Sequence, residues 1–94
     1  MSDSVNETPE DRLKRMRMRA WRRGTKEMDL VLGPWADAHL AGLSPERLDL
    51  FDALLAENNQ DLMAWLLGNA PAPARLAAFL AEIGDFAEHR LRGA

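Results

Sequence analysis

The chain has 94 residues, enough for one domain with a modest core but too few to enclose a large substrate beside a cofactor. It contains no cysteine, which excludes disulfides, cysteine-ligated zinc, iron–sulfur clusters and thiol catalysis. The net charge is −3, yet residues 1–27 hold eight Lys/Arg against five Asp/Glu, so a basic front precedes an acidic remainder.

The first seven residues are polar and aperiodic, and they predict a disordered tail, residues 1–7, before a single domain over residues 8–94. This start lacks the basic residues and apolar core of a secretory signal and is too acidic for a mitochondrial transit peptide. We therefore expect a bacterial cytoplasmic protein. Since no run of about twenty apolar residues occurs, we expect no membrane insertion.

The first predicted helix has Thr8 as its N-cap and Pro9 at its first helical position, and it should run to about Arg22. Its residues divide into two faces at helical spacing. The face expected to be buried carries Leu13, Met16 and Ala20. The opposite face, which we expect to be solvated, is an arginine stripe of Arg12, Arg15, Arg19 and Arg22.

The second predicted helix follows a turn at Gly24, because a glycine directly after a helical run favours a left-handed backbone. Thr25 is placed to serve as its N-cap. The apolar face of this helix carries Met28, Val31, Leu32 and Trp35. The pair Gly33-Pro34 lies inside that pattern, so we expect a kink or break there before the helix ends at Gly42.

Three further helices are predicted from start and stop signals. The third should begin at Ser44-Pro45 and end near Asn58-Asn59, the fourth should span residues 60–67, and the last should span residues 74–91. The sequence shows no period-two alternation and no hairpin signal. The predicted fold class is therefore all-α, a compact single-domain bundle of about five short helices.

The inventory of reactive side chains argues against catalysis. Nucleophilic catalysis needs a hydroxyl placed by a base, but the Ser and Thr residues lie in the predicted tail or at helix caps. Metal ligation needs convergent ligands, and His39 and His89 lack the spacing of a helical pair. The six glycines are dispersed, so no phosphate-binding loop is present. We predict a non-enzymatic protein with no catalytic site, no metal site and no stably bound cofactor.

The segment Arg22-Arg23-Gly24-Thr25-Lys26-Glu27-Met28-Asp29 combines a cationic helix end, a turn glycine and two carboxylates entering the next helix. We interpret it as a docking surface, with Trp21 as a candidate exposed aromatic anchor. A purely structural explanation is also available, because Gly24 and Thr25 cap helices while Glu27 and Asp29 interact favourably with a helix N-terminus.

The arginine stripe offers an alternative function, since it could meet nucleic-acid phosphates, anionic lipid or an acidic protein surface. The acidity of the remaining chain opposes close approach to nucleic acid, so no nucleic acid is expected as a partner. The alternative is a small helical nucleic-acid-binding or regulatory domain. Steep salt dependence of binding would distinguish it from a mixed docking surface.

The turn resembles the RGxxE signature of the succinate dehydrogenase assembly factor 2 family. The resemblance extends from about Leu13 to Phe86 through three further segments in order. These are Leu32-Gly33-Pro34-Trp35, Phe51-Asp52-Ala53-Leu54-Leu55 and Asp61-Leu62-Met63-Ala64-Trp65-Leu66. Family members often carry an acidic residue where this chain has Asn59 and a smaller aromatic at Trp35.

The resemblance implies a small helical bundle that binds the flavoprotein subunit of succinate dehydrogenase, and in some bacteria that of fumarate reductase. It further implies that the protein promotes covalent attachment of the partner's FAD by orienting the flavoprotein, which performs the chemistry itself. Carried over by position, the implied contact residues are Arg23, Gly24 and Glu27, with Asp29 and Trp21 as second-rank candidates.

Overall fold

The computed structural model describes the backbone of residues 7–93 and the side chains of residues 7–90. This part of the chain forms five α-helices and one short 3-10 helix, without strands. They are α1 (Pro9–Trp21), α2 (Lys26–His39), η2 (Leu40–Gly42), α3 (Pro45–Leu55), α4 (Asn59–Leu67) and α5 (Ala74–Gly93). The all-α prediction is confirmed. Residues 1–6 of the predicted tail lie outside the described residues.

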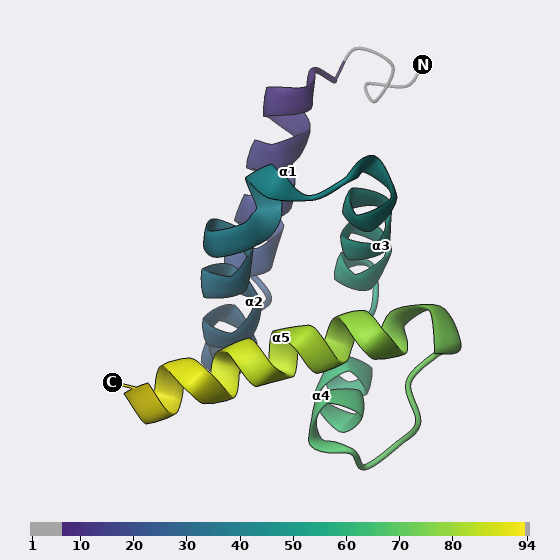
Figure 1. Ribbon diagram of the computed structural model, residues 1–94. Coiled ribbons are helices and arrows are strands. Elements are labelled where there is room, and N and C mark those ends of the chain that lie inside the picture. Colours follow the sequence, from purple (N-terminus) through teal and green to yellow (C-terminus); the bar gives the residue numbers. More distant parts are fainter. Residues whose placement is uncertain (1–6, 94) are drawn as a thin grey trace.

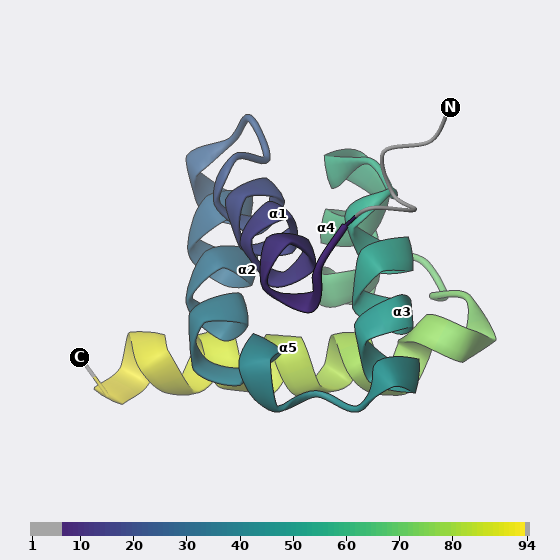
Figure 2. The same ribbon diagram turned by 90° about the horizontal axis from the view of Figure 1, so that it is seen from above.

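The helices surround a single core. α1 and α2 lie side by side, and α3 packs against α1 from another side (Figure 1). α5 runs across the other helices and contacts α2, α3 and α4, as the view from above shows (Figure 2). The turn that joins α1 to α2 is consequently carried on a helix pair fixed by both α3 and α5.

An aromatic cluster of Trp35, Phe51 and Phe79 lies in the core where α2, α3 and α5 meet. The ring centroid of Trp35 lies 5.2 Å from that of Phe51 and 5.0 Å from that of Phe79. α1 contributes Met16 and Ala20, both fully buried. Burial of a large apolar side chain stabilises a fold by about 1.5–3 kcal/mol, so this cluster fixes how the helices cross.

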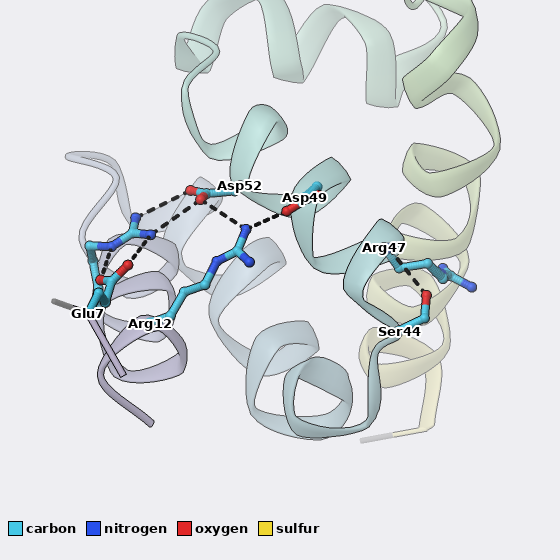
Figure 3. Close-up of polar contacts among 7 residues, drawn as sticks. Glu7, Arg12, Ser44, Arg47, Asp49 and Asp52 are labelled. Carbon is cyan, nitrogen blue, oxygen red and sulfur yellow. Dashed lines mark hydrogen bonds and ion pairs between the residues drawn. The ribbon is translucent and has the colours of Figure 1, made fainter. Parts of the chain in front are cut away.

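The predicted helix starts are confirmed by their capping bonds. Oγ1 of Thr8 accepts a hydrogen bond from the Asp11 amide at 3.0 Å. Oγ of Ser44 accepts one from the Arg47 amide at 3.3 Å (Figure 3). Such caps satisfy amides that have no partner inside the helix. α4 begins one residue earlier than predicted, because Asn58 caps it by accepting from the Asp61 amide at 2.8 Å.

Of the kink or break predicted at Gly33-Pro34, the break is absent, since α2 is continuous from Lys26 to His39. Buried residues on both sides of the pair, Leu32 and Trp35 among them, occupy one helical stripe, and their packing outweighs the lost hydrogen bond of the proline. Gly33 itself is buried, and a methyl group at this position would overlap the indole ring of Trp21. The glycine therefore lets α1 and α2 approach closely.

Candidate partner-docking site

The residues between α1 and α2, 22–25, form what we call the Gly24 turn. Arg22 ends α1 with its amide donating to the Arg19 carbonyl at 3.3 Å. Gly24 has a φ of +98°, in the left-handed region that favours glycine, as predicted. Thr25 then caps α2, with Oγ1 accepting from the Met28 amide at 3.3 Å. The turn is therefore specified by its own residues.

The guanidinium of Arg23 is held by the end of α3 and the start of α4. Nη1 donates to the Leu55 carbonyl at 2.7 Å, and Nη2 donates to the Glu57 carbonyl at 2.6 Å. Nε donates to Oδ1 of Asn59 at 2.9 Å. Hydrogen bonds from a charged group are worth about 1.5–3 kcal/mol each, so this side chain ties the turn to the opposite half of the domain.

The backbone of Arg23 is tied as well. Its amide donates to Oδ1 of Asp29 at 2.6 Å, and its carbonyl accepts from Nδ2 of Asn59 at 2.6 Å. The amide and the carbonyl of Arg23 are thus both hydrogen-bonded to side chains. Asp29, predicted as a second-rank partner contact, is partly buried in this arrangement. Its carboxylate accepts the Arg23 amide and so stabilises the turn.

Two other predicted site residues are presented outward. Gly24 is exposed, and a Cβ added there would meet no atom within 4 Å. Glu27 is exposed on the first turn of α2, and its carboxylate has no hydrogen-bond or ion-pair partner among residues 7–90. The site therefore separates into an anchored part, Arg23 with Asp29, and a presented part, Gly24 with Glu27.

Trp21 lies on the seam between α1 and α2. Its side chain is 37% exposed, Nε1 donates to Oδ2 of Asp37 at 3.2 Å, and the ring covers Gly33. Oδ1 of Asp37 also faces Nε of Arg17 at 3.4 Å. The predicted exposed anchor is therefore partly exposed and held in one orientation by α2.

The arginine stripe is not uniformly solvated, and the prediction is wrong for its first two members. Nη2 of Arg12 lies 2.7 Å from Asp49 and 3.4 Å from Asp52, and Figure 3 shows its side chain reaching toward α3. Arg15 pairs with Glu7 at 2.7 Å and with Asp52 at 3.2 Å. The reason is that α3 packs against α1 and presents its carboxylates along this face.

These pairs shift the titration of their members. The hydrogen bond that Arg12 donates to Asp49 raises the pKa of Arg12, and the bonds that Arg15 donates to Glu7 and Asp52 raise the pKa of Arg15. Burial acts to raise the pKa of Asp52, but the hydrogen bonds and charges of Arg15 and Arg12 outweigh it, so the pKa lies below its ordinary value. This half of the arginine stripe is neutralised within the molecule.

Asn59 is the site residue that pattern analysis did not select. It lies 36 residues after Arg23 and contacts it through both amide atoms. Helical periodicity describes one face of one helix and carries no information about such a distant pair. The available signal was the departure noted at this position, where members of the family often carry an acidic residue and this chain has Asn59.

Two kinds of feature are absent from the described residues. Among them, no group of three His, Asp or Glu side chains is arranged to hold a metal ion. No helix in the described part of the chain combines the length and apolar character needed to cross a membrane.

Comparison with known proteins gives a consistent result. A family model described as "Flavinator of succinate dehydrogenase" matches residues 14–90. The mitochondrial succinate dehydrogenase assembly factor 2 of Candida glabrata is 33% identical, over 92% of this chain and 60% of that protein. The one from Mycosarcoma maydis is 36% identical, over 92% of this chain and 36% of that protein. The FAD assembly factor SdhE of Acetobacter pasteurianus is 31% identical, over 81% of this chain and 73% of that protein.

These relatives overturn the predicted bacterial cytoplasmic location. The fungal proteins that match 92% of this chain are mitochondrial by name. The prediction depended on the acidic character of seven residues, which does not decide a compartment. The present chain moreover spans only 60% and 36% of the lengths of these two proteins.

All three relatives are named as assembly factors and none as an enzyme, in agreement with the prediction of a non-enzymatic protein. The match of the family model covers most of the chain and includes the Gly24 turn. The chain belongs to the succinate dehydrogenase assembly factor 2 family, the flavinators of succinate dehydrogenase.

Proposed function

We propose that this chain binds the flavoprotein subunit of succinate dehydrogenase and promotes the covalent attachment of FAD to that subunit. The observation that carries the proposal beyond family membership is the construction of the Gly24 turn. It is tied to α3 and α4 by the hydrogen bonds of Arg23, yet Gly24 itself is exposed with open space above it.

An anchored and exposed turn suits docking to another protein. Rigid groups lose little conformational freedom on binding, so more of the contact energy appears as affinity. Glycine at the centre lets a partner backbone approach closely. The carboxylate of Glu27, which has no partner among residues 7–90, can accept from a partner Arg, Lys or backbone amide. Arg23, in this account, supports the surface and is not itself the main contact.

The proposed mechanism is positioning of the flavoprotein. By holding parts of its partner in one relative orientation, the chain would raise the fraction of flavoprotein whose reacting groups are aligned. The dispersed glycines of this sequence provide no glycine-rich loop for a pyrophosphate. We therefore assign the FAD to the flavoprotein and no stably bound cofactor to this chain.

The test is flavin attachment in cells that lack the endogenous factor. The flavoprotein subunit of succinate dehydrogenase is expressed with and without this chain, and covalently bound flavin is read as fluorescence of the subunit on a denaturing gel. A fluorescent band that depends on the chain supports the proposal, and equal bands in both cultures contradict it. The same assay with the flavoprotein subunit of fumarate reductase decides whether that protein is also a client.

A further inference from the structure

The end of α1 carries a second feature, a cationic hollow beside the Gly24 turn. This hollow has a volume of about 330 Å³ and is lined by Met18, Arg19, Arg22 and Arg23. Three of its four lining residues are arginines, and none is acidic. A concave surface of this kind concentrates positive potential at one place.

The two halves of α1 differ in how their arginines are compensated. Arg12 and Arg15, near the start of the helix, face three carboxylates of the same chain within 4 Å. Arg19 and Arg23, near its end, donate instead to uncharged groups, among them the carbonyl of Leu55, which both contact. A carbonyl satisfies a hydrogen bond but leaves the net charge in place.

Arg22 is the member of the hollow with spare hydrogen-bonding capacity. It is exposed, and its guanidinium has no hydrogen-bond or ion-pair partner among residues 7–90. Positive charge also accumulates around the hollow. Burial lowers the pKa of Arg23, and the adjacent charge of Arg19 lowers it further. Asp29 offsets this effect only in part. None of the residues that line the hollow thus supplies a negative charge.

We infer that the cationic hollow receives a carboxylate side chain of the flavoprotein partner, with Arg22 as its principal hydrogen-bond donor. The inference rests on the proposed function, and it adds a charged contact beside the Gly24 turn. A guanidinium binds a carboxylate through two parallel hydrogen bonds, and the neighbouring arginines strengthen the attraction. A carboxylate is also the smallest protein group that would supply the missing negative charge.

Two observations favour an acidic residue of a protein over a phosphate of nucleic acid. Met18 is 43% exposed on the wall of the hollow and offers an apolar contact, which suits the methylene groups of Asp or Glu. Nucleic acid would need an extended basic track, but Arg12 and Arg15, which would continue it along α1, are already neutralised.

Affinity for the flavoprotein subunit provides the first test, with Arg22→Gln compared against Lys14→Gln. Both substitutions remove one positive charge from an exposed position, Lys14 within α1 and Arg22 directly after it, and neither breaks a side-chain contact of residues 7–90. Of these two residues, Arg22 lines the hollow and Lys14 does not. We expect Arg22→Gln to weaken binding about tenfold or more, the effect of one charged hydrogen bond, and Lys14→Gln to change it less than threefold.

Zero-length carbodiimide coupling provides the second test, because it joins an amine only to a carboxylate in direct contact. The variant Arg22→Lys places an amine in the hollow, and mass spectrometry of the coupled complex then identifies the residue joined to position 22. We expect an Asp or Glu of the flavoprotein. The complex of the wild-type chain, in which this chain has lysines only at positions 14 and 26, is the control for background coupling.

The outcomes separate this inference from the proposed function. If the wild-type chain binds the subunit while Arg22→Gln and Lys14→Gln bind equally well, the carboxylate site is wrong and the function stands. If the wild-type chain does not bind the subunit, both are wrong. Binding of a 20-base-pair DNA duplex by the wild type that Arg22→Gln abolishes would assign the hollow to phosphate and also overturn the inference.

Discussion

Arg23 and Asn59 exchange hydrogen bonds in both directions. Nε of Arg23 donates to Oδ1 of Asn59 at 2.9 Å, while Nδ2 of Asn59 donates to the carbonyl of Arg23 at 2.6 Å. The pair joins the Gly24 turn to the first residue of α4. Because both donors and both acceptors are fixed, the turn cannot rotate without breaking the contact.

The substitution Asn59→Ala should destabilise the fold by about 1–3 kcal/mol, since it removes both bonds and leaves partly buried polar atoms of Arg23 without partners. Chemical denaturation followed by helical circular dichroism measures the change. Asn69→Ala is the matched control, because Asn69 is exposed and its side chain makes no hydrogen bond among residues 7–90; only its backbone amide donates, to the Ala64 carbonyl. Equal stability of the two variants would show that the exchange between Arg23 and Asn59 contributes nothing.

The two carboxylates in the first turn of α2 should behave differently. Asp29→Ala removes the acceptor of the Arg23 amide, so we expect lower stability, by about 1–3 kcal/mol, together with weaker flavoprotein binding. Glu27→Gln removes no contact among residues 7–90, so stability should be nearly unchanged while binding weakens. Titration calorimetry and thermal unfolding of both variants separate the roles. A stable Asp29→Ala protein would refute the division into anchored and presented residues.

Gly33→Ala should destabilise the fold by about 1–3 kcal/mol, because the added methyl group would overlap the indole of Trp21 and force the helices apart. The double variant Gly33→Ala with Trp21→Ala tests the cause. If the clash with the ring is responsible, the alanine at position 33 should cost much less in the Trp21→Ala background. Additive effects in this double-mutant cycle would place the cause elsewhere.

Acid should remove part of the stability through Asp52. Its pKa in the folded state lies below the ordinary value of 3.8, so its contribution is present above about pH 4 and is lost as the pH falls further. The free energy of unfolding of the wild type should therefore decline more steeply below pH 4 than that of Asp52→Asn. Glu46→Gln, at an exposed position of α3, is the control. Parallel curves for wild type and Asp52→Asn would contradict the ion-pair assignment.

The helices and their starts could be predicted from sequence because the signals are local. Each of three helices is preceded by a Ser or Thr and then shows apolar residues at helical spacing. These residues, Thr8, Thr25 and Ser44, cap the helices that follow. The positive φ of Gly24 was likewise predictable from its place after a helical run. Such features depend on a few neighbouring residues, so the sequence contains their whole cause.

Features that depend on distant packing were not predictable in this way. Continuity of α2 through Pro34 follows from burial on both sides of it, and neutralisation of Arg12 follows from the position of α3. The inward role of Arg23 required knowledge that Leu55, Glu57 and Asn59 lie beside it. The sequence predicted a candidate site in this segment but could not divide it into anchored and presented side chains.

The central claim, that the exposed Gly24 turn is the docking surface, is tested most directly by comparing Gly24→Arg with Gly68→Arg in the flavin-attachment assay. Both glycines have positive φ, +98° and +78°, and open space around the missing side chain, so backbone strain and added charge are matched. At equal amounts of folded chain, we predict that Gly68→Arg supports covalent flavin in the succinate dehydrogenase subunit and that Gly24→Arg does not. Full flavin attachment with Gly24→Arg would contradict the account.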